Sequence, residues 1–171
     1  MTRPSVAATI GQAAPVWRAV CVTGLVTLGG AFAVVFALEQ RGEMGLAWWW
    51  PTAAVGAIAV AASPSRWRWL TAVAVALASG LGSAVAGRPF LVVILGSLGV
   101  AVEVWVVATA VSREQDRPRL TTLTDVGRFA IGAISGAAIV GAFVGVAREF
   151  SGGDFVDAFW TIGASHLSAM V

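Results

Sequence analysis

The feature that most constrains the fold is the spacing of the charged residues. Long uncharged or nearly uncharged stretches alternate with short charged segments. A helix needs about 20 residues, at 1.5 Å each, to cross a hydrocarbon core of ~30 Å. Lipid offers the backbone no water to bond, so we expect a helix in each stretch. The five stretches of about this length cover residues 19–38, 44–65, 69–87, 89–112 and 129–147.

The composition favours the same class. Hydrophobic residues make up 58% of the 171 positions and charged residues 12%, whereas soluble domains carry roughly 25% charged residues. We therefore expect an all-α integral membrane protein whose main partner is the lipid bilayer. All 11 basic residues are arginines, scattered without a basic stripe, which argues against a nucleic-acid partner.

A sixth apolar run closes the sequence. Only residues 158–171 follow the last charge, Asp157. A helix that starts near Phe155 would just cross the bilayer, so we expect five to six transmembrane helices and a domain truncated at its C-terminal end. Residues 1–18 are then a cytoplasmic N-terminal tail, and residues 19–171 form a polytopic membrane domain.

The arginines predict the orientation. With the N-terminus inside, the outer segments hold only Arg41, Arg88 and Arg148, and the other eight arginines are cytoplasmic. Cytoplasmic loops of membrane proteins carry the excess of basic residues. We therefore expect a multi-pass protein of a bacterial plasma membrane with its N-terminus in the cytoplasm.

Glu103 is the sharpest single feature, because it interrupts the fourth apolar stretch. A carboxylate at the bilayer centre costs roughly 2.5–3.5 kcal/mol on insertion scales. It is either a ligand, ion or proton site, or an interhelical hydrogen bond. The sequence names no partner for it. His166, the single histidine, is expected to be packed or interfacial, since it has no companion ligand for a metal.

Three indoles, Trp48, Trp49 and Trp50, stand before Pro51 at the start of the second predicted helix. Proline suits the first turn of a helix. The tryptophans fit either an interfacial aromatic belt or the aromatic wall of an outward-facing ligand pocket.

Small residues recur at a spacing of four. Such faces let helix backbones approach closely, but they do not separate packing within the chain from a homodimer. The polar segment 112–128 precedes the fifth helix, with Thr124 or Asp125 as its candidate cap. The small residues are Ala74, Ala78, Gly82 and Ala86 in the third helix and Gly132, Gly136, Gly141 and Gly145 in the fifth.

Catalytic signatures are absent from the sequence. It contains no phosphate-binding glycine loop, no serine–histidine–aspartate order and no paired carboxylates in a polar stretch. We therefore expect no enzyme activity, cofactor or metal in this chain.

Several motifs together resemble the front part of MASE1, a family of bacterial membrane-associated sensor domains. Two features depart from the family. Ala164, Ser165 and His166 replace its Asp-x-x-Gly pattern, and five or six helices stand where the family has about eight. The motifs are Trp50-Pro51 followed by Ala53 and Gly56, then Arg68-Trp69, Glu103, the segment Leu123 to Phe129, and Phe159-Trp160 followed by Gly163.

The resemblance implies a sensory input domain that regulates a cytoplasmic output: a diguanylate cyclase, a cyclic-di-GMP phosphodiesterase or a histidine kinase of a two-component system. A longer parent protein would carry that enzyme. Glu103 and Trp48 to Trp50 would belong to the input end, which responds to an unknown small ligand or membrane partner. Two alternatives stay open: a small transporter or channel fragment with Glu103 as the coupling carboxylate, and a structural membrane subunit that binds helices through its small-residue faces.

Overall fold

The structure, a computed structural model, describes residues 24, 29, 30, 32, 50–112 and 120–170. Within these residues the chain is helical and contains no strand. The predicted tail over residues 1–18, most of the first predicted span, Trp48 and Trp49 lie outside them. The elements are α2 (Pro51–Ala62), the 3₁₀ turn η1 (Ser65–Trp67), α3 (Arg68–Val85), α4 (Phe90–Val111), α5 (Leu123–Glu149) and α6 (Phe155–Met170).

Helix α2 differs from its prediction. The uncharged stretch 44–65 predicts a helix of bilayer length, but α2 has 12 residues, or about 18 Å. It ends because Pro64 disfavours a helical conformation at Ser63, which is extended with φ −73° and ψ 144°. The expectation of one helix through residue 65 is therefore wrong at its C-terminal end.

Helix α5 begins earlier than expected, at Leu123. Thr122 is its N-cap, and a capping box with Asp125 closes the first turn. The candidate caps Thr124 and Asp125 were therefore misplaced: Thr122 caps the helix, and Asp125 is its third residue. Helix α6 starts at Phe155, as the sequence predicts.

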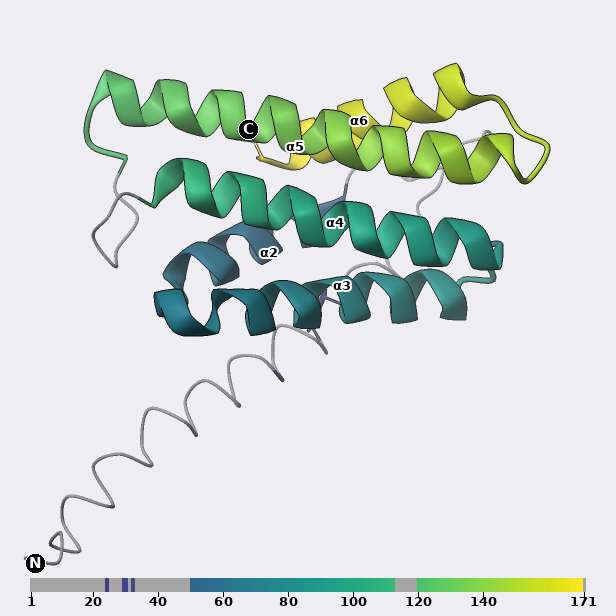
Figure 1. Cartoon of the computed structure of the whole chain (residues 1–171), viewed down its shortest axis with the longest axis horizontal. Coiled ribbons are helices and arrows are strands. Elements are labelled where there is room, and N and C mark those ends of the chain that lie inside the picture. The colour runs from purple at the N-terminus through teal and green to yellow at the C-terminus, as the bar shows by residue number, and fades with distance from the viewer. Residues whose placement is uncertain (1–23, 25–28, 31, 33–49, 113–119, 171) are drawn as a thin grey trace, which may run out of the picture.

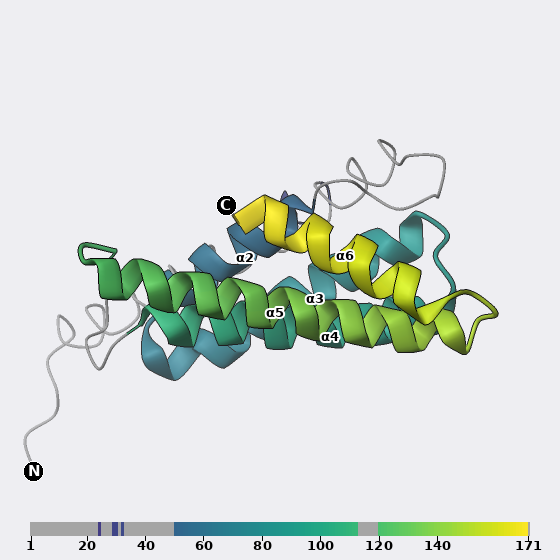
Figure 2. The ribbon, with the colours of Figure 1, turned by 90° about the horizontal axis from the view of Figure 1, so that it is seen from above.

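Three stretches in the described part of the chain are long and apolar enough to cross a membrane: Ser65–Val85, Phe90–Val111 and Leu123–Glu149. Helices α3, α4 and α5 lie side by side in one layer, and α2 and α6 pack across one face of that layer (Figures 1 and 2). Helix α4 is central, since it contacts α2, α3 and α5.

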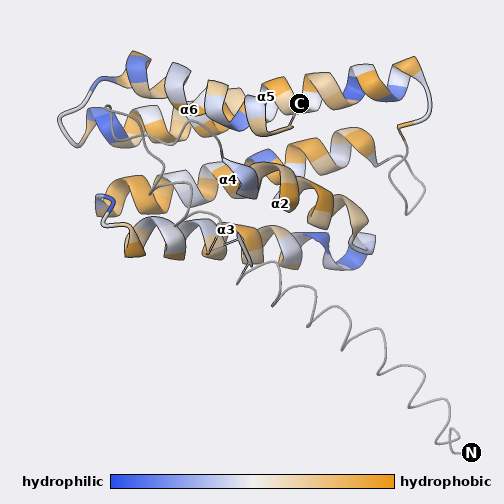
Figure 3. Ribbon diagram, turned by 180° about the vertical axis from the view of Figure 1, so that it is seen from behind, coloured by the Kyte–Doolittle hydropathy of each residue, from blue (hydrophilic) through white to orange (hydrophobic). Residues whose placement is uncertain are grey.

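The distribution of residue sizes is that of a protein surrounded by lipid. The core consists mainly of alanine, glycine and valine, whereas larger apolar side chains such as Leu77, Phe90 and Ile131 are exposed. Apolar residues accordingly cover much of the outer surface of the helices (Figure 3). A water-soluble bundle would bury these large side chains, so the exposed faces indicate a membrane protein.

Four of the five glycines of α5 fall into two pairs. A Cβ atom on Gly132 would lie 2.7 Å from Ala110 Cβ, and one on Gly136 would lie 3.0 Å from Glu103 Cγ, both in α4. One on Gly141 would lie 2.7 Å from Phe159 O, and one on Gly145 would lie 2.8 Å from the Phe155 ring, both in α6. The small-residue face of α5 therefore makes contacts within the chain.

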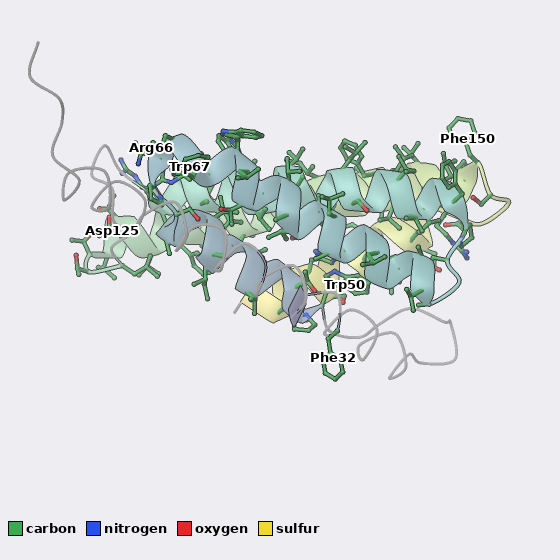
Figure 4. The ribbon with its side chains drawn as sticks, turned by 90° about the horizontal axis from the view of Figure 1, so that it is seen from below. Phe32, Trp50, Arg66, Trp67, Asp125 and Phe150 are labelled. Atoms are coloured by element: carbon green, nitrogen blue, oxygen red, sulfur yellow. The ribbon has the colours of Figure 1, made fainter. Side chains whose placement is uncertain are left out.

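The two ends of the bundle are chemically distinct (Figure 4). Asp125, Arg66 and Trp67 lie at one end, here called the Asp125 end, where the Arg66 guanidinium sits 5.8 Å from the Trp67 ring centroid. Phe150 lies at the opposite end, here called the Phe150 end. The turn that contains Arg88 belongs to the Phe150 end, because α4 begins there and runs antiparallel to α5.

Candidate functional site

Glu103 and His166 form a buried pair inside the bundle. Glu103 Oε2 lies 2.6 Å from His166 Nδ1, although the residues are 63 positions apart in sequence. The side chains are 0% and 2% exposed. A contact this short needs one hydrogen between the two atoms, so either the imidazole N–H or the carboxyl O–H donates. The pair therefore joins α4 to α6 through a single shared proton position.

Glycines let the helices approach closely enough for this contact. Gly136 of α5 faces the stem of Glu103 and leaves space for it. Gly163 of α6 lies against the backbone of Ala137, where its Cβ would be 3.4 Å from Ala137 O. Small residues on both sides of the α5–α6 contact thus bring His166 within reach of α4.

Trp50 adds a third helix to the site. It immediately precedes α2, is 7% exposed, and stacks on His166 with ring centroids 5.6 Å apart and planes at 18°. Trp50 is therefore buried against the pair, whereas Trp48 and Trp49 lie outside the described residues. The two interpretations of the three tryptophans, an interfacial belt and the wall of an outward-facing ligand pocket, stay predictions.

Two buried polar atoms at the site have no hydrogen-bond partner among the described residues: Trp50 Nε1 and Glu103 Oε1. Buried polar atoms in folded proteins nearly always have partners, and each exception calls for an explanation such as an unseen water or a role in function. The site can therefore donate one further hydrogen bond, from Trp50 Nε1, and accept at least one, at Glu103 Oε1.

A cavity of about 40 Å³ reaches the pair from the Phe150 end. Its polar lining consists of Trp50, Ser79, Arg88 and His166. Glu103 does not line it, but its hydrogen-bond partner His166 does. The apolar lining consists of Val92, Gly96, Val100, Val140, Val144 and Ile162.

A larger cavity of about 330 Å³ lies towards the Asp125 end, between α2, α4 and the start of α5. It is lined only by apolar side chains: Ala57, Ile58, Ala61, Ala62, Val107, Val111, Leu120 and Phe129. No titratable side chain of the described residues borders it.

Glu103 stands out in the sequence, but its partner His166 does not. His166 was expected to be a packed or interfacial residue, and the structure instead pairs it with Glu103. The positions of the two residues along their helices are the signal that could have revealed the pair. Glu103 lies 13 residues after Phe90, and His166 lies 11 residues after Phe155. Both helices start at the Phe150 end, so the two residues reach depths of about 20 and 17 Å at 1.5 Å per residue.

In the part of the chain that the structure describes, no three side chains among histidine, cysteine, aspartate and glutamate gather where they could hold a metal ion. What the pair offers chemically is a protonation site or a hydrogen-bonding site inside an apolar bundle.

No family model, curated protein or solved structure matches this chain. The resemblance to the MASE1 sensor domains therefore rests on the sequence motifs alone.

Proposed function

We propose that this chain is a membrane-embedded sensory input domain in which the Glu103–His166 pair is the responsive element. The observation that carries the proposal is the pair itself: a carboxylate and an imidazole, both fully buried, that link two helices distant in sequence. Ionisable residues inside membrane spans are costly and usually mark functional sites.

The pair is suited to a two-state response because its contact depends on one proton. Gaining or losing a proton, or binding a ligand at the unused oxygen Glu103 Oε1, changes the interaction between α4 and α6. A stimulus shifts the equilibrium between two helix packings only if it favours one of them. The stack of Trp50 on His166 extends any such change to the start of α2.

The proposal extends to a multi-pass protein of a bacterial plasma membrane with a cytoplasmic N-terminus. The arginine distribution supports this orientation, with Arg88 and Arg148 on the outer side. The regulated output would be a cytoplasmic diguanylate cyclase, cyclic-di-GMP phosphodiesterase or histidine kinase, which is what the sequence resemblance implies.

The test places Glu103→Gln and His166→Gln in the native protein in its own cells. We expect both substitutions to change cellular cyclic-di-GMP or kinase autophosphorylation in the same direction and by a similar factor. Gly127→Ala is the matched control, because a Cβ at Gly127 meets no atom within 4 Å. Unchanged output in both variants, at equal membrane abundance, would contradict the proposal.

A proton-coupled transporter is the second candidate, since carboxylate–histidine chains form proton relays in pumps. Transport needs access from both faces, and the polar cavity in the described part of the chain runs from Arg88 at the Phe150 end to His166. Access from that face is what sensing requires. Proton-driven uptake into vesicles that Glu103→Gln abolishes would instead favour transport.

A further inference from the structure

We propose that the cavity between Arg88 and His166 holds water and forms a one-sided path for protons to the Glu103–His166 pair. The inference rests on the proposed function in one respect: it names the proton as the species to which the Glu103–His166 pair responds. The presence of water in the cavity does not depend on that role. Three observations carry it: the size of the cavity, its polar lining and its position.

The size of the cavity selects water over a larger ligand. A cavity needs at least about 10–15 Å³ to admit one water molecule, and this one has about 40 Å³. It therefore has room for a short string of waters. Pockets that bind drug-sized ligands measure roughly 300–1,000 Å³, so a metabolite of that size does not fit.

The polar lining of the cavity favours the binding of water. Purely apolar cavities remain dry, whereas a buried water needs two to four polar partners. Trp50 Nε1 is a buried donor without a partner among the described residues. Ser79, only 2% exposed, adds a hydroxyl group from α3. A water oxygen that accepts from the indole N–H gives Trp50 Nε1 a hydrogen-bond partner.

The position of the cavity makes the path one-sided. Arg88 lines it at the Phe150 end, and His166 lines it at the depth of the pair. Arg88 and His166 are the only charged or titratable side chains on its described lining, and Glu103 contacts His166 without lining it. Helix α2 contributes no charged residue, and α5 contributes Val140 and Val144 to the cavity.

The proton balance is simple. His166 Nδ1 is engaged by Glu103, so Nε2 is the ring nitrogen left to accept a proton from water. Once Nε2 is protonated, Nδ1–H donates to the carboxylate, or its proton moves to Glu103 and leaves both groups neutral. In either case the pair gains one proton from water. The hydroxide that remains passes to the bulk water on the Phe150 side.

The single histidine of the chain makes the test direct. The whole chain is labelled with ¹⁵N-histidine and reconstituted in liposomes, and solid-state NMR then reports the His166 ring nitrogens without overlap. We expect magnetisation transfer from water to this ring.

Two variants test which cavity supplies the water. Gly96→Ala narrows the small cavity without a clash, because its Cβ would lie 3.5 Å from Val144 Cγ2. Ala62→Val narrows the larger apolar cavity. We expect Gly96→Ala to reduce the water-to-His166 transfer several-fold and Ala62→Val to leave it unchanged.

Three results would overturn the inference: no transfer from water to His166 in the wild-type chain, equal transfer in both variants, or a loss confined to Ala62→Val. The result is separable from the proposed function. If the site is dry but Glu103→Gln still changes the output, only the water path fails. If water reaches His166 but Glu103→Gln and His166→Gln leave the output unchanged, only the sensing role fails.

Discussion

The two buried carboxylates among the described residues are held in opposite ways. Asp125 is 5% exposed and Glu103 is 0% exposed. Asp125 Oδ2 accepts hydrogen bonds from the backbone N–H groups of Thr121 and Thr122 and from the Thr122 hydroxyl, at 3.3, 3.1 and 2.8 Å. Glu103 is bonded to a residue 63 positions away, and its Oε1 has no described partner.

The difference separates a carboxylate held by its own helix turn from one held by a distant helix. These hydrogen bonds join Asp125 to residues no more than four positions away, so they form together with the first turn of α5 and stabilise that helix N-terminus. The contact of Glu103 exists only while α6 packs against the rest of the bundle. A change in that packing alters Glu103 and leaves Asp125 as it is.

The largest expected effect is that of His166→Leu, which leaves Glu103 buried without its partner. Removing one partner of a buried ion pair costs about 3–5 kcal/mol, and we expect a loss of this size in the free energy of unfolding, measured in mixed micelles. Ser168→Ala, on the same helix, is the control, because Ser168 bonds only to Ser165 O in its own turn. A loss near 1 kcal/mol would mean a neutral hydrogen bond, as is common between membrane helices.

Gly136→Ala tests whether the space beside Glu103 is needed. Its Cβ would lie 3.0 Å from Glu103 Cγ and 3.4 Å from Glu103 O, and overpacking of this kind costs about 1–3 kcal/mol. Gly127→Ala should instead stabilise the helix by up to about 1 kcal/mol, because it relieves glycine entropy without a clash. Thermal unfolding of the two variants should shift in opposite directions. Shifts of the same sign would contradict the tight α4–α5 contact.

Thr122→Ala removes the N-cap of α5. We expect a loss of about 1 kcal/mol, with hydrogen exchange raised only in the first turn after Leu123. The ¹⁵N signals of His166 should not change, because the capping box and the buried pair share no residue. A shifted His166 signal would show that the two carboxylate sites are coupled.

The smallest effect is expected for Asp125→Asn. The amide retains one oxygen to accept from the Thr121 and Thr122 N–H groups, and it loses the attraction between a negative charge and the helix N-terminus, worth about 0.3–1 kcal/mol. Unfolding measurements should therefore place this variant close to the wild-type chain. A loss as large as that of His166→Leu would remove the distinction between the two carboxylates.

Much of the fold is readable from the sequence because its signals are local. Charge-free stretches of bilayer length predict α3 and α4 closely, and Phe155 is the expected start of α6. The boundary errors have local causes as well: Pro64 ends α2 early, and the Thr122 capping box starts α5 inside the segment taken for a loop.

Only part of the site could be predicted from the sequence. A carboxylate in an apolar stretch is conspicuous, so Glu103 stands out from the sequence alone. His166 does not, because one histidine near the end of a short apolar run looks like packing. Trp50 is ambiguous for a similar reason: an indole beside a helix start fits an interfacial belt as well as the wall of a ligand pocket, and the sequence does not reveal that it is 7% exposed.

The sequence by itself determined that these segments are helices suited to lipid, because the cost of burying charges and unpaired backbone groups acts residue by residue. It also determined that Glu103 needs a partner. The tertiary structure alone decided which partner: packing at Gly136, Gly141 and Gly163 brings α4, α5 and α6 close enough for Glu103 to meet His166. A hydrogen bond across 63 positions depends on how helices dock, and no local pattern encodes that.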